Sequence, residues 1–221
     1  MKSLGITVIA VAVIVIIGAI IVFNIIKPEQ KLKVYKPSDI NSKLIDENSI
    51  KKAGPHRIAN FELINQNGIT VTEKALENKI YVADFFFTTC PSICPVMSSQ
   101  MKRLNDKYKN DSDFIIVSHT VMPEIDTPEV LAEYALLYDA SEKNWLFLTG
   151  DKKSIYELAR QSYFAVTTEG DGDEHDFIHT ENFILVDKEK RIRGFYDGTD
   201  KNDVDRLILE IEILKKEYIK K

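Results

Sequence analysis

Residues 80–87, with the sequence IYVADFFF, constrain the fold of this chain more than any other segment. The run is almost entirely apolar and is rich in β-branched and aromatic side chains. Such a composition predicts a central strand that is covered on both of its faces. We therefore expect an α/β fold, in which helices pack on both sides of a sheet.

The segments after residue 90 alternate between helix-like and strand-like patterns, as in a mostly parallel sheet. A helix is expected directly after the cysteines, because Met97, Met101, Leu104 and Tyr108 are spaced as on one helical face. The later elements expected are a strand at 114–117, a helix at 128–137 with Thr127 as its cap, a strand at 145–148, a helix at 155–162, an antiparallel hairpin of strands 183–186 and 192–196, and a last helix. This order is that of a thioredoxin-like three-layer α/β/α sandwich.

A second hairpin is expected at the start of the domain. Two short strand-like runs flank Asn67-Gly68, the dipeptide that favours a type I′ turn. Before this hairpin, residues 27–57 are polar, rich in lysine and interrupted by prolines, which indicates a linker. The sequence thus predicts three parts: a membrane anchor at 1–26, a polar linker at 27–57 and a thioredoxin-like domain at 58–221.

The anchor is predicted from residues 4–26, which include no charged side chain. About 20 apolar helical residues cross the roughly 30 Å core of a bilayer. The run is longer than the apolar part of a cleaved signal peptide, about 7 to 15 residues, so we expect a single transmembrane helix. Lysines follow this run more often than they precede it, and by the positive-inside rule this favours a domain in the cytoplasm. Large domains, however, are translocated largely regardless of their charge.

The two cysteines, Cys90 and Cys94, stand in TTCPSICP beyond the end of the central strand. Pro95 fits the first turn of a helix, so Cys94 is expected at or next to the N-cap. The positive end of the helix dipole favours thiolates, which serve both disulfide exchange and metal binding. Three intervening residues leave room for both sulfurs to face one ion. Soft thiolates select Cu(I), zinc or iron–sulfur clusters, and two cysteines are too few for a four-thiolate cluster.

A third ligand with a nitrogen donor is expected, and four histidines are available. His56 lies in the predicted linker and is expected to be solvated. In an extended chain His175 and His179 are ~13 Å apart, so only one of them can share an ion with the cysteines. His179 directly precedes a strand and is the more rigidly placed of the two. His119, at the same edge of the sheet as the cysteines, is the main alternative.

Three stretches of the chain resemble the Sco/SenC family of membrane-anchored, thioredoxin-like copper proteins: DFFFTTCPSICPVM, EIDTPEVLAEYA and HTENFILVDKEKRIRGFYDG. The resemblance covers about residues 58–215. It implies that Cys90, Cys94 and His179 bind copper, as Cu(I) or Cu(II). It further implies a metallochaperone that assists assembly of the dinuclear copper centre of cytochrome c oxidase, with the copper-centre subunit as its partner.

The sequence departs from the family pattern at two places. Ile178 stands where the family commonly has Asp, and MPEID, residues 122–126, stands where it often reads D-P-E-R-D. Whether Asp84, His119 or Asp126 supports the ligands is left open by these departures.

A second hypothesis is a thiol–disulfide oxidoreductase that reduces client cysteines before they receive metal. The sequence thus favours a metallochaperone as the main role and allows thiol–disulfide oxidoreductase activity beside it. A dithiol that cycles with its disulfide belongs outside the cytoplasm, so we expect the domain on the extracytoplasmic side of the membrane. With 29 Lys and Arg against 34 Asp and Glu, the chain gives no sign of the basic face that nucleic-acid binding requires.

Overall fold

The computed structural model describes residues 11–19, 22, 30–39, 56–166, 170, 172–173 and 176–219. The chain divides into two compact units, Met1–Lys31 and Leu32–Lys221. The second unit is built on a seven-stranded sheet with the order β2-β1-β5-β4-β3-β6-β7. Its strands are β1 (Glu62–Asn65), β2 (Thr70–Thr72), β3 (Ile80–Phe86), β4 (Phe114–Thr120), β5 (Trp145–Thr149), β6 (Asn182–Val186) and β7 (Ile192–Asp197).

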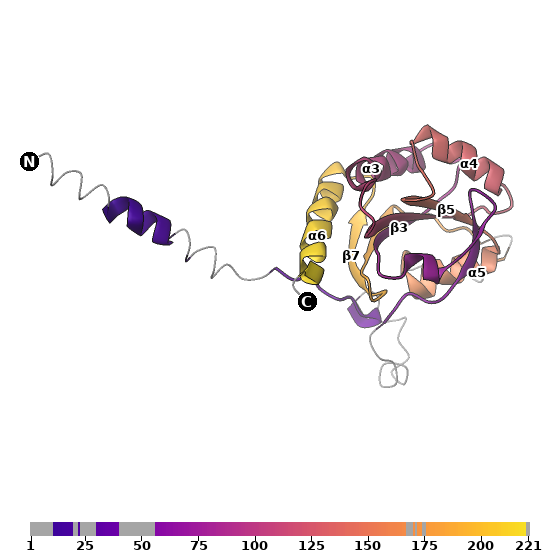
Figure 1. Ribbon diagram of the computed structural model, residues 1–221. Coiled ribbons are helices and arrows are strands. Elements are labelled where there is room, and N and C mark those ends of the chain that lie inside the picture. Colours follow the sequence, from indigo (N-terminus) through magenta and orange to yellow (C-terminus); the bar gives the residue numbers. More distant parts are fainter. Residues whose placement is uncertain are drawn as a thin grey trace, which may run out of the picture. The chain divides into compact units, whose positions relative to one another are not determined.

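The three central strands β3, β4 and β5 run parallel. Strands β1 and β6 pair antiparallel with β5 and β3, and the edge strands β2 and β7 pair antiparallel with β1 and β6. Helices α3 (Ile93–Tyr108), α4 (Pro128–Leu137) and α6 (Lys201–Ile219) pack on one face, whereas α5 (Lys152–Glu157) and the π-helical turn η4 (Leu158–Ser162) cover the other (Figure 1). The predicted three-layer α/β/α arrangement is therefore confirmed.

Strand β3 shows why the sheet is covered on both sides. All seven of its residues are buried. Val82 and Phe86 belong to the core beneath α3, while Tyr81 and Phe85 belong to the core beneath α5. Successive side chains of a strand point to opposite faces, so an apolar run without alternation needs a cover on each.

Most predicted elements are confirmed with small shifts of their ends. Helix α4 has the predicted bounds, and Thr127 caps it by accepting a hydrogen bond from the Val130 N–H at 3.5 Å. Strand β4 runs three residues beyond its predicted end and includes His119. Helix α5 starts three residues earlier than predicted, where the Asp151 side chain accepts from the Ser154 N–H at 2.8 Å.

The turn between β1 and β2 is not the predicted type I′ turn, which requires a positive φ at two successive residues. Gly68 has a φ of 73°, but Asn67 is not among the residues with positive φ. The Gly68 N–H donates to the Asn65 carbonyl, as in a type I turn that ends on a left-handed glycine. The Asn65 side chain favours this turn because it accepts from the N–H groups of Asn67 and Ile69, each at 3.0 Å.

The predicted transmembrane helix at residues 4–26 lies largely outside the described residues. Among the residues that are described, none of the helices has the length and apolar character needed to cross a membrane.

Part of the predicted linker lies against the domain. The Arg193 side chain, 3% exposed, donates to the carbonyl oxygens of Leu32 and Lys33 at 2.8 and 3.1 Å. The Tyr35 N–H donates to the Ile192 carbonyl at 2.9 Å. Residues 32–35 are therefore fixed to the beginning of β7, and residues 40–55 of the predicted linker lie outside the described part of the chain.

Candidate metal centre

The two cysteines lie where β3 passes into α3, beyond the carboxyl ends of the parallel strands. Ser92 is the N-cap of α3, so Cys94 is the second helical residue and Pro95 the third. The sequence placed Cys94 at or next to the cap, and the helix in fact begins slightly before it. Cys90 lies in the preceding loop, as predicted, and its N–H donates to the Phe87 carbonyl at 3.3 Å.

Both thiols are free and buried, with 5% of Cys90 and 3% of Cys94 exposed. The Cys94 N–H points at the Cys90 sulfur at 3.5 Å, and the Ser92 hydroxyl lies 3.8 Å from the same sulfur. Burial works against the Cys90 thiolate, but hydrogen bonds from the Cys94 and Ser92 N–H groups outweigh it and lower the pKa of Cys90 to about 7. Burial raises the pKa of Cys94 to about 12, and the neighbouring Cys90 and Asp84 act in the same direction. Of the two thiols, Cys90 is therefore the one with a pKa near neutrality.

His179 lies in the extended segment that leads into β6. Its neighbours Ile178 and Thr180 are buried, whereas Phe177 and His179 are exposed. The Phe177 ring lies 6.5 Å from the His179 ring and 5.4 Å from the ring of Phe87, three residues before Cys90. Aromatic side chains thus connect the histidine segment to the cysteine loop.

The structure does not gather the predicted ligands into one coordination sphere. Within the described part of the chain, no three His, Cys, Asp or Glu side chains form a group that could hold a metal ion. The ligand set of Cys90, Cys94 and His179 therefore stays a prediction. His175 lies outside the described residues. Ile178, which replaces the Asp common in the family, is buried in the core beneath α5.

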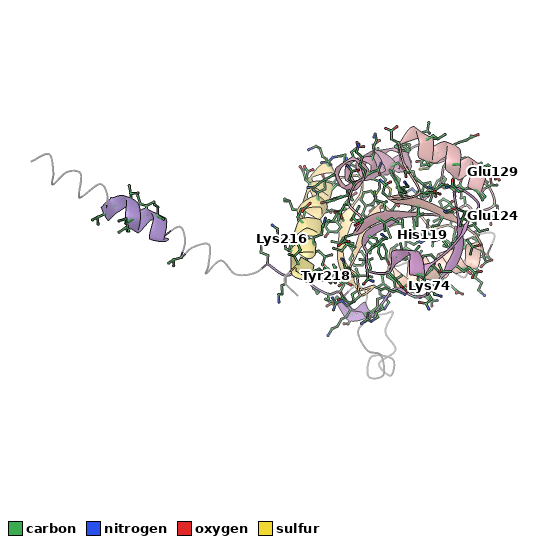
Figure 2. The ribbon with its side chains drawn as sticks, in the orientation of Figure 1. Lys74, His119, Glu124, Glu129, Lys216 and Tyr218 are labelled. Atoms are coloured by element: carbon green, nitrogen blue, oxygen red, sulfur yellow. The ribbon has the colours of Figure 1, made fainter. Side chains whose placement is uncertain are left out.

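His119, the alternative third ligand, points to the wrong face of the sheet. It pairs with Phe85 in the register of β3 and β4, and the two rings stack at 4.9 Å (Figure 2 labels His119 in the domain interior). Phe85 belongs to the core beneath α5, whereas Cys90 and Cys94 belong to the core beneath α3. The sheet lies between His119 and the thiols, so His119 does not supply the third ligand.

His56 also differs from its predicted state. It is half-buried rather than solvated, with its ring nitrogen 2.7 Å from the Ser162 carbonyl and its ring 4.5 Å from that of Phe164. These contacts lie on the α5 side of the sheet, so His56 has a packing role.

Replacing His119 by phenylalanine is expected to stabilise the protein. His119 is fully buried, and although its ring interacts with the Asp84 backbone, neither ring nitrogen makes a hydrogen bond of normal geometry within the described residues. An unpaired buried polar group costs roughly 1 to 3 kcal/mol, and phenylalanine fits the same aromatic surroundings. Urea unfolding at pH 7 should therefore show His119→Phe to be the more stable protein.

The same variant should lose part of its sensitivity to acid. Burial lowers the pKa of His119 to about 4 from 6.5. Between these values the unfolded chain binds a proton that the folded chain does not, so the stability of the folded chain falls as the pH falls from 6.5 to 4. His119→Phe removes this slope, at most about 1.4 kcal/mol per pH unit. Equal slopes for both proteins between pH 6.5 and 4.5 would contradict this account.

A sheet of this topology with a pair of cysteines at the junction of its central strand and a helix defines a thiol-bearing protein of the thioredoxin-like class. Comparison with protein families gives the particular family. The SCO1/SenC family model matches residues 51–214, and the chain belongs to this family.

Known proteins agree with this assignment. The SCO1 protein homolog of Bacillus subtilis (strain 168) is 34% identical over 165 residues, which cover 74% of this chain and 85% of the relative. The structure of BsSco, described as a member of the Sco family of cytochrome c oxidase assembly proteins with a disulfide switch, has a TM-score of 0.61 and 33% identity over 72% of this chain and 93% of that one. Arabidopsis thaliana ScoI with copper bound gives a TM-score of 0.57 and 30% identity over 72% and 98%. The family and fold predicted from the sequence are thereby confirmed.

Proposed function

We propose that this protein is a copper metallochaperone that binds copper through Cys90, Cys94 and His179. It then passes the ion to the copper-centre subunit of cytochrome c oxidase. The observation that carries the proposal is the buried pair of free thiols at the start of α3, in a family that includes a copper-bound relative. Thiolate sulfur is the donor that Cu(I) prefers, so the residues present fit this cargo.

The two thiols have different parts in capturing the ion. Cys90 offers the first sulfur, because hydrogen bonds lower its pKa to about 7 and a large fraction of it, about half, is thiolate at neutral pH. The pKa of Cys94 is about 12, so its proton leaves only as the metal takes its place. His179 supplies the third donor, and its exposed side chain has to approach the sulfurs to do so, because the structure does not group it with them. An open site with few ligands suits an ion that has to be released again.

His179→Ala is expected to weaken Cu(I) binding by at least roughly 100-fold, because loss of a direct ligand should cost no less than the roughly 10- to 100-fold that loss of an outer-shell partner costs. Anaerobic competition of the full-length protein with a chromophoric Cu(I) chelator measures this affinity. His119→Phe is the matched control, because it also removes one imidazole but from the far face of the sheet. The third ligand is wrongly assigned if the two variants bind Cu(I) equally well.

A second candidate function is thiol–disulfide exchange, which the contrast between the Cys90 and Cys94 pKa values favours. The Cys90 thiolate attacks a client disulfide, forms a mixed disulfide and releases one client thiolate. Cys94 then loses its proton and attacks the Cys90 sulfur, which releases the second client thiolate and leaves a Cys90–Cys94 disulfide. The client gains the two electrons that the protein loses. This exchange should persist in His179→Ala, whereas copper transfer should not.

We also propose that residues 4–26 anchor the protein in a membrane, with the thiol domain on the extracytoplasmic side. The uncharged apolar run and the redox chemistry of the thiols support this arrangement. Alkaline phosphatase, which is active only outside the cytoplasm, should be active when fused after Lys221. The same fusion without residues 1–26 should be inactive. Two inactive fusions would place the domain in the cytoplasm.

A further inference from the structure

Asp126 is a buried carboxyl group next to the cysteine loop. It directly precedes Thr127, the cap of α4, and 0% of its surface is exposed. Its carboxyl oxygens accept three hydrogen bonds: from the Thr88 N–H at 3.2 Å, from the Thr88 hydroxyl at 2.5 Å and from the Thr120 hydroxyl. Thr88 lies two residues before Cys90, and its N–H and its hydroxyl thus both donate to the Asp126 carboxyl group.

The carboxyl group is itself held firmly in place. The Asp126 N–H donates to the Met122 carbonyl at 2.9 Å, and the Met122 N–H donates to the Thr120 hydroxyl oxygen at 3.0 Å. Thr120 is the last residue of β4, and the following residue, Val121, donates to the Phe86 carbonyl at 2.8 Å. Asp126 therefore links the cysteine loop to the ends of two central strands.

Holding a carboxyl group at this depth is costly. Transfer of such a group out of water is unfavourable unless hydrogen bonds or a cation compensate it. Three hydroxyl or N–H donors compensate Asp126, and none of the ion pairs among the described residues involves it. An apolar side chain at position 126 would fill the space at lower cost, but the N–H and the hydroxyl of Thr88 would then lose their hydrogen-bond acceptors.

We propose that Asp126 is the positioning residue of the thiol site, which acts through Thr88 on the conformation of the Cys90 loop. This inference rests on the proposed function of Cys90 and Cys94 and extends it to a residue that touches neither sulfur. With Thr88 fixed, the chain from residue 88 to Ser92 is held where the Cys94 N–H reaches the Cys90 sulfur. Without it, the loop is free to move and the two sulfurs no longer face one ion.

The test uses Thr88, because loss of a buried carboxyl group can unfold the domain. Thr88→Val removes the hydroxyl and keeps the shape, whereas Thr88→Ser keeps the hydroxyl. Thr120→Val is the matched control, since it removes a hydroxyl from the other side of the same carboxyl group. Thr120→Val should lower the midpoint of urea unfolding at least as much as Thr88→Val, because the buried Thr120 hydroxyl also accepts a hydrogen bond from the Met122 N–H.

Two further measurements on the full-length protein separate positioning from stability. In the metal-free protein, amide hydrogen exchange of residues 88–94 should be roughly tenfold faster in Thr88→Val and unchanged in Thr88→Ser and Thr120→Val. The Cu(I) affinity should fall roughly 10- to 100-fold in Thr88→Val alone.

The outcomes distinguish this inference from the proposed function. Equal exchange rates of residues 88–94 in Thr88→Val and Thr120→Val would overturn the positioning role of Asp126. If instead the loop exchanges faster in Thr88→Val but Cu(I) binding of the parent protein does not need Cys90, the positioning role stands and the copper function fails.

Discussion

Cys90→Ser is expected to abolish tight Cu(I) binding. A serine hydroxyl is a hard, weakly acidic donor, whereas Cu(I) selects soft thiolates. One remaining thiol cannot hold the ion against a competing chelator, so the loss should exceed the roughly 10- to 100-fold that removal of a supporting residue costs. Anaerobic chelator competition measures the loss, and Cys94→Ser should give the same result.

The two serine variants should differ in a second assay. At pH 7, iodoacetamide should modify Cys94→Ser much faster than Cys90→Ser, because only Cys90 has a pKa near 7.

For the Cu(I) binding assay, Met97→Leu is the control for the loss of a sulfur atom from this part of the chain. Met97 is fully buried in the core beneath α3, and its replacement should leave Cu(I) binding unchanged. Equal Cu(I) losses in Met97→Leu and Cys90→Ser would refute the assignment of the ligands.

The second large effect is expected from Arg193→Met, which should destabilise the folded protein by about 3 to 5 kcal/mol. The buried guanidinium pairs with Asp187 at 3.0 Å and with Glu217 at 2.8 Å. It also satisfies the carbonyls of Leu32 and Lys33. Methionine fills much of the volume but removes the cation from Glu217 and leaves Asp187 with Arg191 alone, at 2.7 Å. Urea unfolding of the full-length protein measures the change.

Lys201→Met provides the comparison for Arg193→Met. Lys201 pairs with Asp205 at 3.2 Å, but its side chain is 70% exposed, so its loss should cost less than about 1 kcal/mol. Amide exchange at Leu32 and Tyr35 should be faster in Arg193→Met and unchanged in Lys201→Met. If both variants unfold at the same urea concentration as the parent, Arg193 does not hold the chain as described.

The elements that the sequence predicted best are those with strong local signals. The apolar run of β3 needs cover on both faces wherever it lies, and Thr127-Pro128 starts a helix without help from distant residues. The predicted strand ended at Val117 because the next three residues, Ser118, His119 and Thr120, are polar and do not continue the apolar run. Their burial depends on distant partners: the Trp145 indole donates to Ser118 at 2.9 Å, and Asp126 accepts from Thr120.

In the candidate site, too, only the features with local sequence signals could be predicted. The cysteine pair was predictable, because its spacing and Pro95 are local features. The face on which His119 lies was not, since it follows from how far β4 extends and how it pairs with β3. The attachment of residues 32–35 depends on Arg193, about 160 positions along the chain, and no periodicity marks it.

The attachment of Leu32–Tyr35 determines how the domain responds to tension in the chain that precedes it. Tyr35 joins β7 at Ile192, and the strand pairing places this end of the hairpin beside Tyr81, near the amino end of β3. Cys90 follows the opposite end of β3, about 20 Å away for a strand of this length. A force applied to the chain before Leu32 would therefore act first on the contacts of Arg193 and its carboxylates, at the end of β3 opposite to the cysteines.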